Sequence, residues 1–365
     1  MRQKPTTLNF PSLRTPSYWL VNKYKFFSYS FVLLAVVLTP VMANAVDITE
    51  QLHRPSNNSF GRQSRDDADA LLRVGQKHYD AGYPEKAIDA GLQALKIYHA
   101  IGDFRAKGLT YDLLAKAYIQ LGRYKEGEDA LRRQLGIARD TQDFQSQIFV
   151  LNNIGTLFLQ SGQPAPADKM LEEALKIAQN VKNIEGQGLS LSNLGLVYAR
   201  QGDYNKAIKL YETALIYRRR SGDLRGELNT LNNLGDAYLE AGNYQDTIAT
   251  FGAAMGMARI NRDRANQIRA IDGLVTAHTA AGRYERAFEL LQQRLILAQE
   301  LQNLPEQLRS FESYAQLYEL LGNYPTAQNF YERAIILSQN LKDSRKEVVL
   351  RDRLTQMLKR RVKSS

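Results

Sequence analysis

Apolar and small residues recur along the chain with a helical spacing that repeats every 40 residues. In the block that begins at Leu191, positions 1, 4, 5 and 8 are Leu191, Leu194, Gly195 and Tyr198, and the next block repeats the pattern. This spacing follows one face of a helix, because a strand would alternate with a period of two. A second stripe of the same kind follows at positions 17, 21, 24 and 25. Each block therefore predicts two helices, and the small residues Gly195 and Ala207 predict that these helices pack closely.

Two further positions mark where the helices begin and end. Position 12 is glycine in seven successive blocks, and glycine ends a helix because it adopts the left-handed conformation without a steric cost. These residues are Gly82, Gly122, Gly162, Gly202, Gly242, Gly282 and Gly322. Position 33 is Asp or Asn, which suits the N-cap of the next helix. These residues are Asp103, Asp143, Asn183, Asp223, Asp263, Asn303 and Asp343. A constant period of this length indicates a stacked array of seven helix pairs, over residues 66–350.

The repeated positions resemble those of the tetratricopeptide repeat over residues 69–350. Leu-Gly-x-x-Tyr, Gly-x-Tyr and Ala-Leu carry the likeness, and NNLGDAYLEAGNYQDTIATF (Asn232 to Phe251) is one good example. The resemblance implies an all-α fold, an α-α right-handed superhelix whose concave groove binds peptides or protein segments. The 40-residue period and the missing proline after the second helix are similar to the repeats of Pins-type adaptors, kinesin light chains and Rap-type regulators.

The first 45 residues have the order of a secretory signal peptide. Residues 1–25 carry five basic side chains and no acid, an apolar run follows over residues 26–42, and Ala43 and Ala45 provide a small-x-small cleavage signal. We expect export to the periplasm or the outside and a mature chain that starts at Val46. The alternative is an uncleaved membrane anchor that would hold residues 1–45 in a membrane, because the uncharged stretch is barely long enough to span a bilayer.

Composition defines the two ends of the array. Residues 46–65 predict a polar linker, since Pro55, Gly61 and nearby Ser and Asn residues break the periodicity. Residues 351–365 combine apolar positions with many basic ones, which predicts a capping helix or tail that covers the last repeat. The formal net charge is +10, and five of these charges come from the predicted signal region.

The charge inside the repeats is mixed in sign, whereas nucleic-acid binding requires a continuous basic stripe. We therefore expect no nucleic-acid partner. Arg218, Arg219 and Arg220 form the one basic cluster inside the repeats. They lie at a predicted helix C-terminus, where the helix dipole favours cations, so we expect them to be solvated.

The sequence contains no catalytic constellation. There is no cysteine, the four histidines lack metal-ligand spacing, and the glycines recur as helix ends rather than as a phosphate-binding loop. His78 and His278 both occupy position 8, where other blocks carry Tyr or Phe, and are expected to pack. We therefore expect no enzyme activity, no catalytic residues, no cofactor and no metal.

Positions 3, 6 and 10 of the first helix share one face, beside the apolar stripe. Position 3 is asparagine in three successive blocks, at Asn153, Asn193 and Asn233. A side-chain amide both donates and accepts hydrogen bonds, so such a ladder suits the backbone of an extended peptide. In the similar families, asparagines at this position have that role. The alternative is a ladder that bonds between neighbouring repeats and stabilises the array.

Positions 6 and 10 of the same face would add selectivity for a ligand. The candidate contacts are Lys116 and Arg200 for a carboxylate, Asp236 and Glu240 for a basic side chain, and Gln160 as a further polar contact. The sequence thus predicts an exported, non-enzymatic scaffold that binds a peptide or partner protein, of unknown identity, in the groove. The alternative is a membrane-anchored assembly factor that oligomerises or docks partners through the convex face or the ends of the array.

Overall fold

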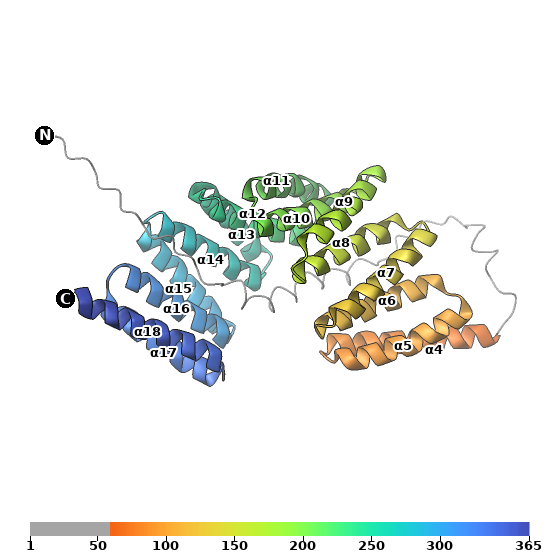
Figure 1. Cartoon of the computed structure of the whole chain (residues 1–365), viewed down its shortest axis with the longest axis horizontal. Coiled ribbons are helices and arrows are strands. Elements are labelled where there is room, and N and C mark those ends of the chain that lie inside the picture. Colours follow the sequence, from red (N-terminus) through yellow and green to blue (C-terminus); the bar gives the residue numbers. More distant parts are fainter. Residues whose placement is uncertain (1–58, 365) are drawn as a thin grey trace. The chain divides into compact units, whose positions relative to one another are not determined.

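A computed structural model describes residues 59–364, and the side chains of residues 63–360 (Figure 1). Every regular element in this range is an α-helix, which confirms the predicted fold class. The helices are α4 (Ser59–Asp80), α5 (Pro84–Ile101), α6 (Phe104–Gln120), α7 (Tyr124–Asp140), α8 (Phe144–Gln160), α9 (Pro164–Asn180), α10 (Ile184–Gln201), α11 (Tyr204–Ser221), α12 (Leu224–Glu240), α13 (Tyr244–Ile260), α14 (Arg264–Ala280), α15 (Tyr284–Glu300), α16 (Leu304–Leu320), α17 (Tyr324–Asn340) and α18 (Ser344–Ser364).

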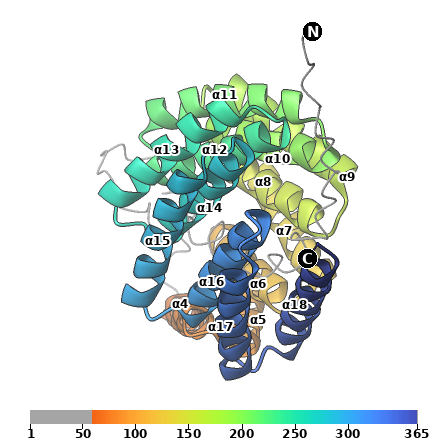
Figure 2. The same ribbon diagram turned by 90° about the vertical axis from the view of Figure 1, so that its left-hand side faces the viewer.

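The chain divides into two compact units. The first holds α4–α7 together with residues 160–162, and the second holds the rest of α8 and α9–α18. Within each unit consecutive helices pack together, for example α4 on α5 and α10 on α11. Figure 2 shows α16, α17 and α18 side by side at the end of the second unit. Each repeat therefore contributes a first and a second helix, and α18 stands as a first helix without a second.

The ends of the described region differ in detail from the predicted boundaries. Helix α4 begins at Ser59, so residues 59–65 of the predicted linker are helical. Helix α18 begins at Ser344, a few residues before the predicted cap at 351. No helix within residues 59–364 has the length and apolar character needed to cross a membrane. The predicted signal or anchor, residues 1–45, lies outside the described residues.

The predicted helix ends are confirmed in every repeat. All seven position-12 glycines are left-handed, with φ between 71° and 84°. All seven position-33 side chains accept a hydrogen bond of 2.7–3.2 Å from the backbone N–H three residues later. Each such N-cap contributes about 1 kcal/mol to the stability of the helix that it begins.

The small residues at position 5 set the distance between the two helices of a repeat. A Cβ atom on Gly195 would lie 2.6–2.9 Å from ring atoms of Tyr211, and one on Gly235 would lie 2.8–2.9 Å from the ring of Phe251. Real side chains do not approach this closely, so the second helix packs directly against the backbone of the first. The predicted close approach at Gly195 is confirmed, with Ala207 fully buried beside the same ring.

A left-handed residue also follows each of the seven second helices, at position 32, and five of these seven residues are not glycine. Five residues hold φ between 49° and 55°: Gln142, Lys182, Arg262, Gln302 and Lys342. The equivalent residues Gly102 and Gly222 are left-handed glycines. A side chain in this region costs about 1–2 kcal/mol, which exceeds the entropy that glycine loses on folding, about 0.4–1 kcal/mol.

We therefore expect Gln302→Gly to raise the free energy of unfolding by about 0.5–1 kcal/mol, measured by urea titration. The reverse change, Gly222→Gln, should lower it by a similar amount. A loss of stability in Gln302→Gly would show that contacts of the glutamine side chain outweigh the backbone strain.

Candidate functional site

The predicted binding residues lie on the first helices of the repeats. Lys116 is on α6 in the first unit, and the others are Asn153 and Gln160 on α8, Asn193 and Arg200 on α10, and Asn233, Asp236 and Glu240 on α12. We use "first-helix face" for positions 2, 3, 6 and 10 of α8, α10, α12, α14 and α16. The contacts on this face decide which side chains are available to a ligand.

Position 2, beside the predicted asparagine ladder, carries buried polar contacts between repeats. The Asn152 amide nitrogen donates to the carbonyl of Ile148 at 2.9 Å and to the hydroxyl of Ser190, on the next first helix, at 2.8 Å. Because a backbone carbonyl only accepts, the nitrogen of Asn152 must face it and the side-chain oxygen must point away. That oxygen accepts from the amide of Asn193 at 2.9 Å.

The same kind of contact recurs between the next pairs of first helices. The hydroxyls of Ser192 and Thr230 lie 2.8 Å apart, and the Asn232 amide donates to the side-chain oxygen of Asn266 at 2.9 Å. Position 2 was not among the positions predicted from the sequence to carry polar contacts. The signal was present, because position 2 is polar in six of the seven blocks although it adjoins the apolar stripe. Alanine at such sites would leave partners buried and unpaired, so these residues fix how neighbouring repeats stack.

The three ladder asparagines are engaged to different degrees. Asn193 donates to Asn152, and Asn233 accepts from the guanidinium of Arg269 at 2.8 Å. Asn153 has no hydrogen bond from its side chain to any described residue. Since arginine only donates, the oxygen of Asn233 must face it. Asn193 therefore keeps a free oxygen, Asn233 a free NH₂ group and Asn153 both. Two of the three asparagines thus bond between repeats, as the second alternative predicts, and each of these two keeps half of its amide without a partner among the described residues.

The predicted charged contacts are not equivalent. Asp236 pairs with Arg269 at 2.7 Å, whereas Glu240 makes no ion pair with a described residue. Desolvation, and then the charge of Asp236, raise the pKa of Glu240. Arg200 donates to the backbone carbonyl of Leu159 on α8 and keeps other N–H groups free. Glu240 and Arg200 are thus the available charges at this part of the face.

The remaining predicted contacts lie elsewhere. Lys116 is buried on α6 and pairs with Asp112 of the same helix at 2.5 Å. Its charge is therefore balanced by a carboxylate of the first unit. Gln160 is half-buried, and its side-chain oxygen has no hydrogen-bond partner in the described part of the chain.

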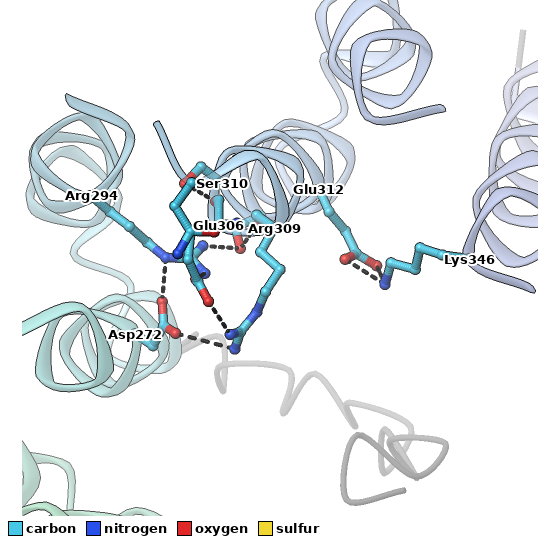
Figure 3. Close-up of polar contacts among 9 residues, drawn as sticks. Asp272, Arg294, Glu306, Arg309, Ser310, Glu312 and Lys346 are labelled. Carbon is cyan, nitrogen blue, oxygen red and sulfur yellow. Dashed lines mark hydrogen bonds and ion pairs between the residues drawn. The ribbon is translucent and has the colours of Figure 1, made fainter. Parts of the chain in front are cut away.

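Ion pairs occupy the first-helix face toward its C-terminal end, on α14 and α16 (Figure 3). Arg294 reaches from α15 and contacts Asp272 at 2.8 Å and Glu306 at 3.1 Å. Arg309 contacts the same two carboxylates, at 3.5 and 2.9 Å. The following pair, Lys346 with Glu312 at 2.7 Å, joins α18 to α16. Most charges on this part of the array are therefore neutralised by ion pairs with neighbouring helices of the array.

The prediction that Arg218, Arg219 and Arg220 are all solvated is wrong for Arg218. Its side chain is buried and pairs with Asp223, the N-cap of α12, while Gly226 leaves the space that its guanidinium fills. Desolvation lowers the pKa of Arg218, and Asp223 opposes the shift. Arg219 pairs with Glu227 at 2.6 Å, and Arg220 is exposed.

Within residues 59–364 no three His, Asp or Glu side chains are grouped so that they could hold a metal ion. His278 is buried on α14, in the packing position expected for it, and desolvation lowers its pKa.

Comparisons with known proteins agree with this architecture. A family model described as "Tetratricopeptide repeat" matches residues 108–180, 187–260 and 267–339, which is more than half of the chain. No curated protein matches the sequence. The signal transduction ATPase with numerous domains PH0952 from Pyrococcus horikoshii, which has a tetratricopeptide repeat sensor, superposes with a TM-score of 0.63 and 19% identity. The match covers 80% of this chain and 46% of PH0952, so this chain spans less than half of that protein.

Two Rap proteins are also similar in structure. The apo form of RapI gives a TM-score of 0.57 with 15% identity, over 76% of this chain and 99% of RapI. A Rap protein complexed with competence and sporulation factor gives 0.51 with 10% identity, over 84% and 99% of the two chains. At these identities the likeness concerns the fold alone.

Proposed function

Since the chain belongs to the tetratricopeptide repeat family, whose members are generally non-enzymatic scaffolds, we propose that it binds a peptide or an extended protein segment on the first-helix face of α8, α10 and α12. The observation that carries this proposal is the set of available amide groups: the whole side-chain amide of Asn153 and half of the amide of Asn193 and of Asn233. In register, they present an acceptor at Asn193 and a donor at Asn233. A peptide backbone offers the complementary groups at every residue.

The distribution of charged side chains also favours α8, α10 and α12 as the binding region. Glu240 and Arg200 flank the ladder without a carboxylate–guanidinium partner, whereas the position-2 acids of α14 and α16, Asp272 and Glu312, are paired within the array. A ligand there would have to displace buried pairs, at a high desolvation cost. We therefore place the ligand on α8–α12. The Rap protein complexed with competence and sporulation factor is a structural neighbour with a bound partner, in keeping with this role.

The test uses peptides selected from a random library for binding to the purified protein. We expect the variant Asn153→Ala/Asn193→Ala/Asn233→Ala to bind the best selected peptide about ten- to a thousandfold more weakly, because each lost hydrogen bond costs about 0.5–1.5 kcal/mol. Isothermal titration calorimetry measures this loss, and circular dichroism confirms that the variant is folded.

A matched variant controls for the loss of three amides. Asn180, Asn205 and Asn340 are exposed on second helices, so replacing all three with alanine should leave peptide affinity unchanged. Equal affinity of the ladder variant and this control would show that the asparagines only join the repeats.

We also propose that the protein is exported and that residues 1–45 are removed. This rests on the order of basic, apolar and small residues at the N-terminus. The intact mass of protein recovered from the extracytoplasmic fraction would be that of residues 46–365. A mass that includes residues 1–45 would favour a retained anchor.

A further inference from the structure

One edge of the second unit concentrates arginines that have no carboxylate partner. It consists of the turns from α11 to α12 and from α13 to α14, and we call it the arginine edge. Its members are all exposed: Arg220, Leu224, Arg259, Ile260, Arg262 and Arg264. Arg220, Arg259 and Arg262 make no ion pair with a described residue, and Arg264 bonds only to the neutral side chain of Gln267. The two acids of these turns, Asp223 and Asp263, serve as N-caps.

The helix dipole explains only part of this cluster. Arg220 and Arg259 lie at helix C-termini, where cations are favoured. Arg262 directly follows the C-cap of α13, whereas Arg264 is the first residue of α14. Positive charge is unfavourable at a helix N-terminus, so the helix dipoles do not account for Arg264. An anion bound at this edge from outside the protein would balance its charge.

Apolar side chains are interleaved with these arginines. Ile260 is 82% exposed and Leu224 is 55% exposed. With the 40-residue period, Ile260 occupies the position of Arg220 in the neighbouring turn, and Arg264 occupies that of Leu224. Each of these two exposed apolar side chains therefore has an arginine at the equivalent position of the adjacent repeat. Further exposed apolar residues continue along the same kind of turn in the second unit, namely Phe144, Val181, Leu301 and Leu304.

The opposite ends of the same helices are different. The turns from α10 to α11 and from α12 to α13 carry Lys206 with Asp203, and Asp246 near Glu240, so their charges are mixed. The excess of positive charge thus belongs to one edge of these repeats. The opposite edge of the same repeats therefore serves as an internal control for the arginine edge.

We propose that the arginine edge lies against an anionic lipid bilayer, with its arginines at the phosphate headgroups and Leu224 and Ile260 inserted at the boundary of the acyl chains. Isolated apolar tips flanked by cations suit a fluid surface, which needs no complementary shape. A protein partner would need a closely packed, shape-complementary core, which single apolar side chains separated by arginines do not provide, and a nucleic acid would gain little from an aliphatic side chain.

Co-sedimentation with vesicles tests this proposal. The purified protein should bind vesicles of phosphatidylcholine with about a third phosphatidylglycerol more tightly than vesicles of phosphatidylcholine alone. Each arginine near such a surface contributes about fivefold, so Arg220→Gln/Arg259→Gln/Arg262→Gln should reduce this binding roughly a hundredfold. Equal binding of the unaltered protein to both kinds of vesicle would overturn the proposal. Any contribution of the N-terminal residues is common to all variants.

A second variant separates a bilayer from other polyanions. Leu224→Ser/Ile260→Ser keeps every charge, and we expect about tenfold weaker binding to the anionic vesicles with unchanged binding to heparin. The control Lys206→Gln/Tyr244→Ser, on the opposite edge, should bind the vesicles as the unaltered protein does. If the serine variant kept full vesicle binding, attraction between charges alone would hold the edge to the vesicles, as to any polyanion, and the proposed insertion into a bilayer would be wrong.

Discussion

Replacing Arg294 with alanine should lower the free energy of unfolding of the last repeats by about 3 kcal/mol. The side chain is 1% exposed and bridges Asp272 and Glu306, on the helices before and after its own (Figure 3). Truncation removes one cation from two carboxylates that are largely withdrawn from water and leaves a void. The expected loss is at the lower end of the range for broken buried pairs, because Arg309 remains 2.9 Å from Glu306 and 3.5 Å from Asp272.

Hydrogen exchange of the amides in α14–α16 measures this loss locally, which matters because long repeat arrays do not unfold as one cooperative unit. Arg286→Ala is the matched control. Arg286 lies on the same helix and pairs with Glu289, but about half of each side chain is exposed, so at most about 1 kcal/mol should be lost. A similar loss in both variants would mean that burial of the network adds nothing to its strength.

The helix ends could be predicted because they depend on local backbone chemistry. Gly242 ends α12 with a φ of 78°, as glycine must where a side chain would be strained, and Asn303 caps α16 three residues before the N–H that it binds. Both effects act within about four residues along the chain. Repetition at 40-residue intervals then made each of them visible seven times. The fold class followed from the same repetition.

The contacts between repeats could not be predicted in the same way. The sequence places Asn193 and Asn152 forty-one residues apart, and only the stacking distance of two first helices brings their amides to 2.9 Å. Arg218 shows the same limit. The helix dipole alone accounted for a cation at this helix end, so a solvated side chain was predicted. The turn instead folds back and brings Asp223 onto the guanidinium of Arg218. Which side chains pair across a turn or between repeats depends on distances in space, and the 40-residue period does not give these distances.

These contacts also divide the candidate site by function. On α14 and α16 the position-2 acids Asp272 and Glu312 are bound by basic side chains of the array, which fixes the stacking of those repeats. On α8 and α10 the buried position-2 residues do this work with neutral groups such as Asn152 and Ser192. The adjacent position 3 then keeps amide groups that have no partner among the described residues. The peptide proposal therefore rests on different roles for two neighbouring positions: position 2 joins the repeats, and position 3 has hydrogen-bonding groups for a ligand.

The asparagine ladder stops at Gly273, where a fully buried ring occupies the space that a side chain would need. Phe251 projects from α13 between two first helices, where a Cβ on Gly235 would lie 2.8 Å from its ring and one on Gly273 would lie closer still. A side chain at position 3 of that repeat would overlap the ring where it now lies. Packing of the second helix therefore favours glycine at this position and interrupts the ladder.

We expect Phe251→Ala to lower the free energy of unfolding by about 3–5 kcal/mol, because it removes a buried ring that two glycines accommodate. Gly273→Asn, which would extend the ladder, should cost about 1–3 kcal/mol through overpacking against the same ring. The two changes should compensate, since the asparagine enters the space that the ring leaves. Urea unfolding of the two single variants and the double variant measures this coupling. Additive losses would show that the ring does not exclude a side chain at Gly273, and that another cause ends the ladder there.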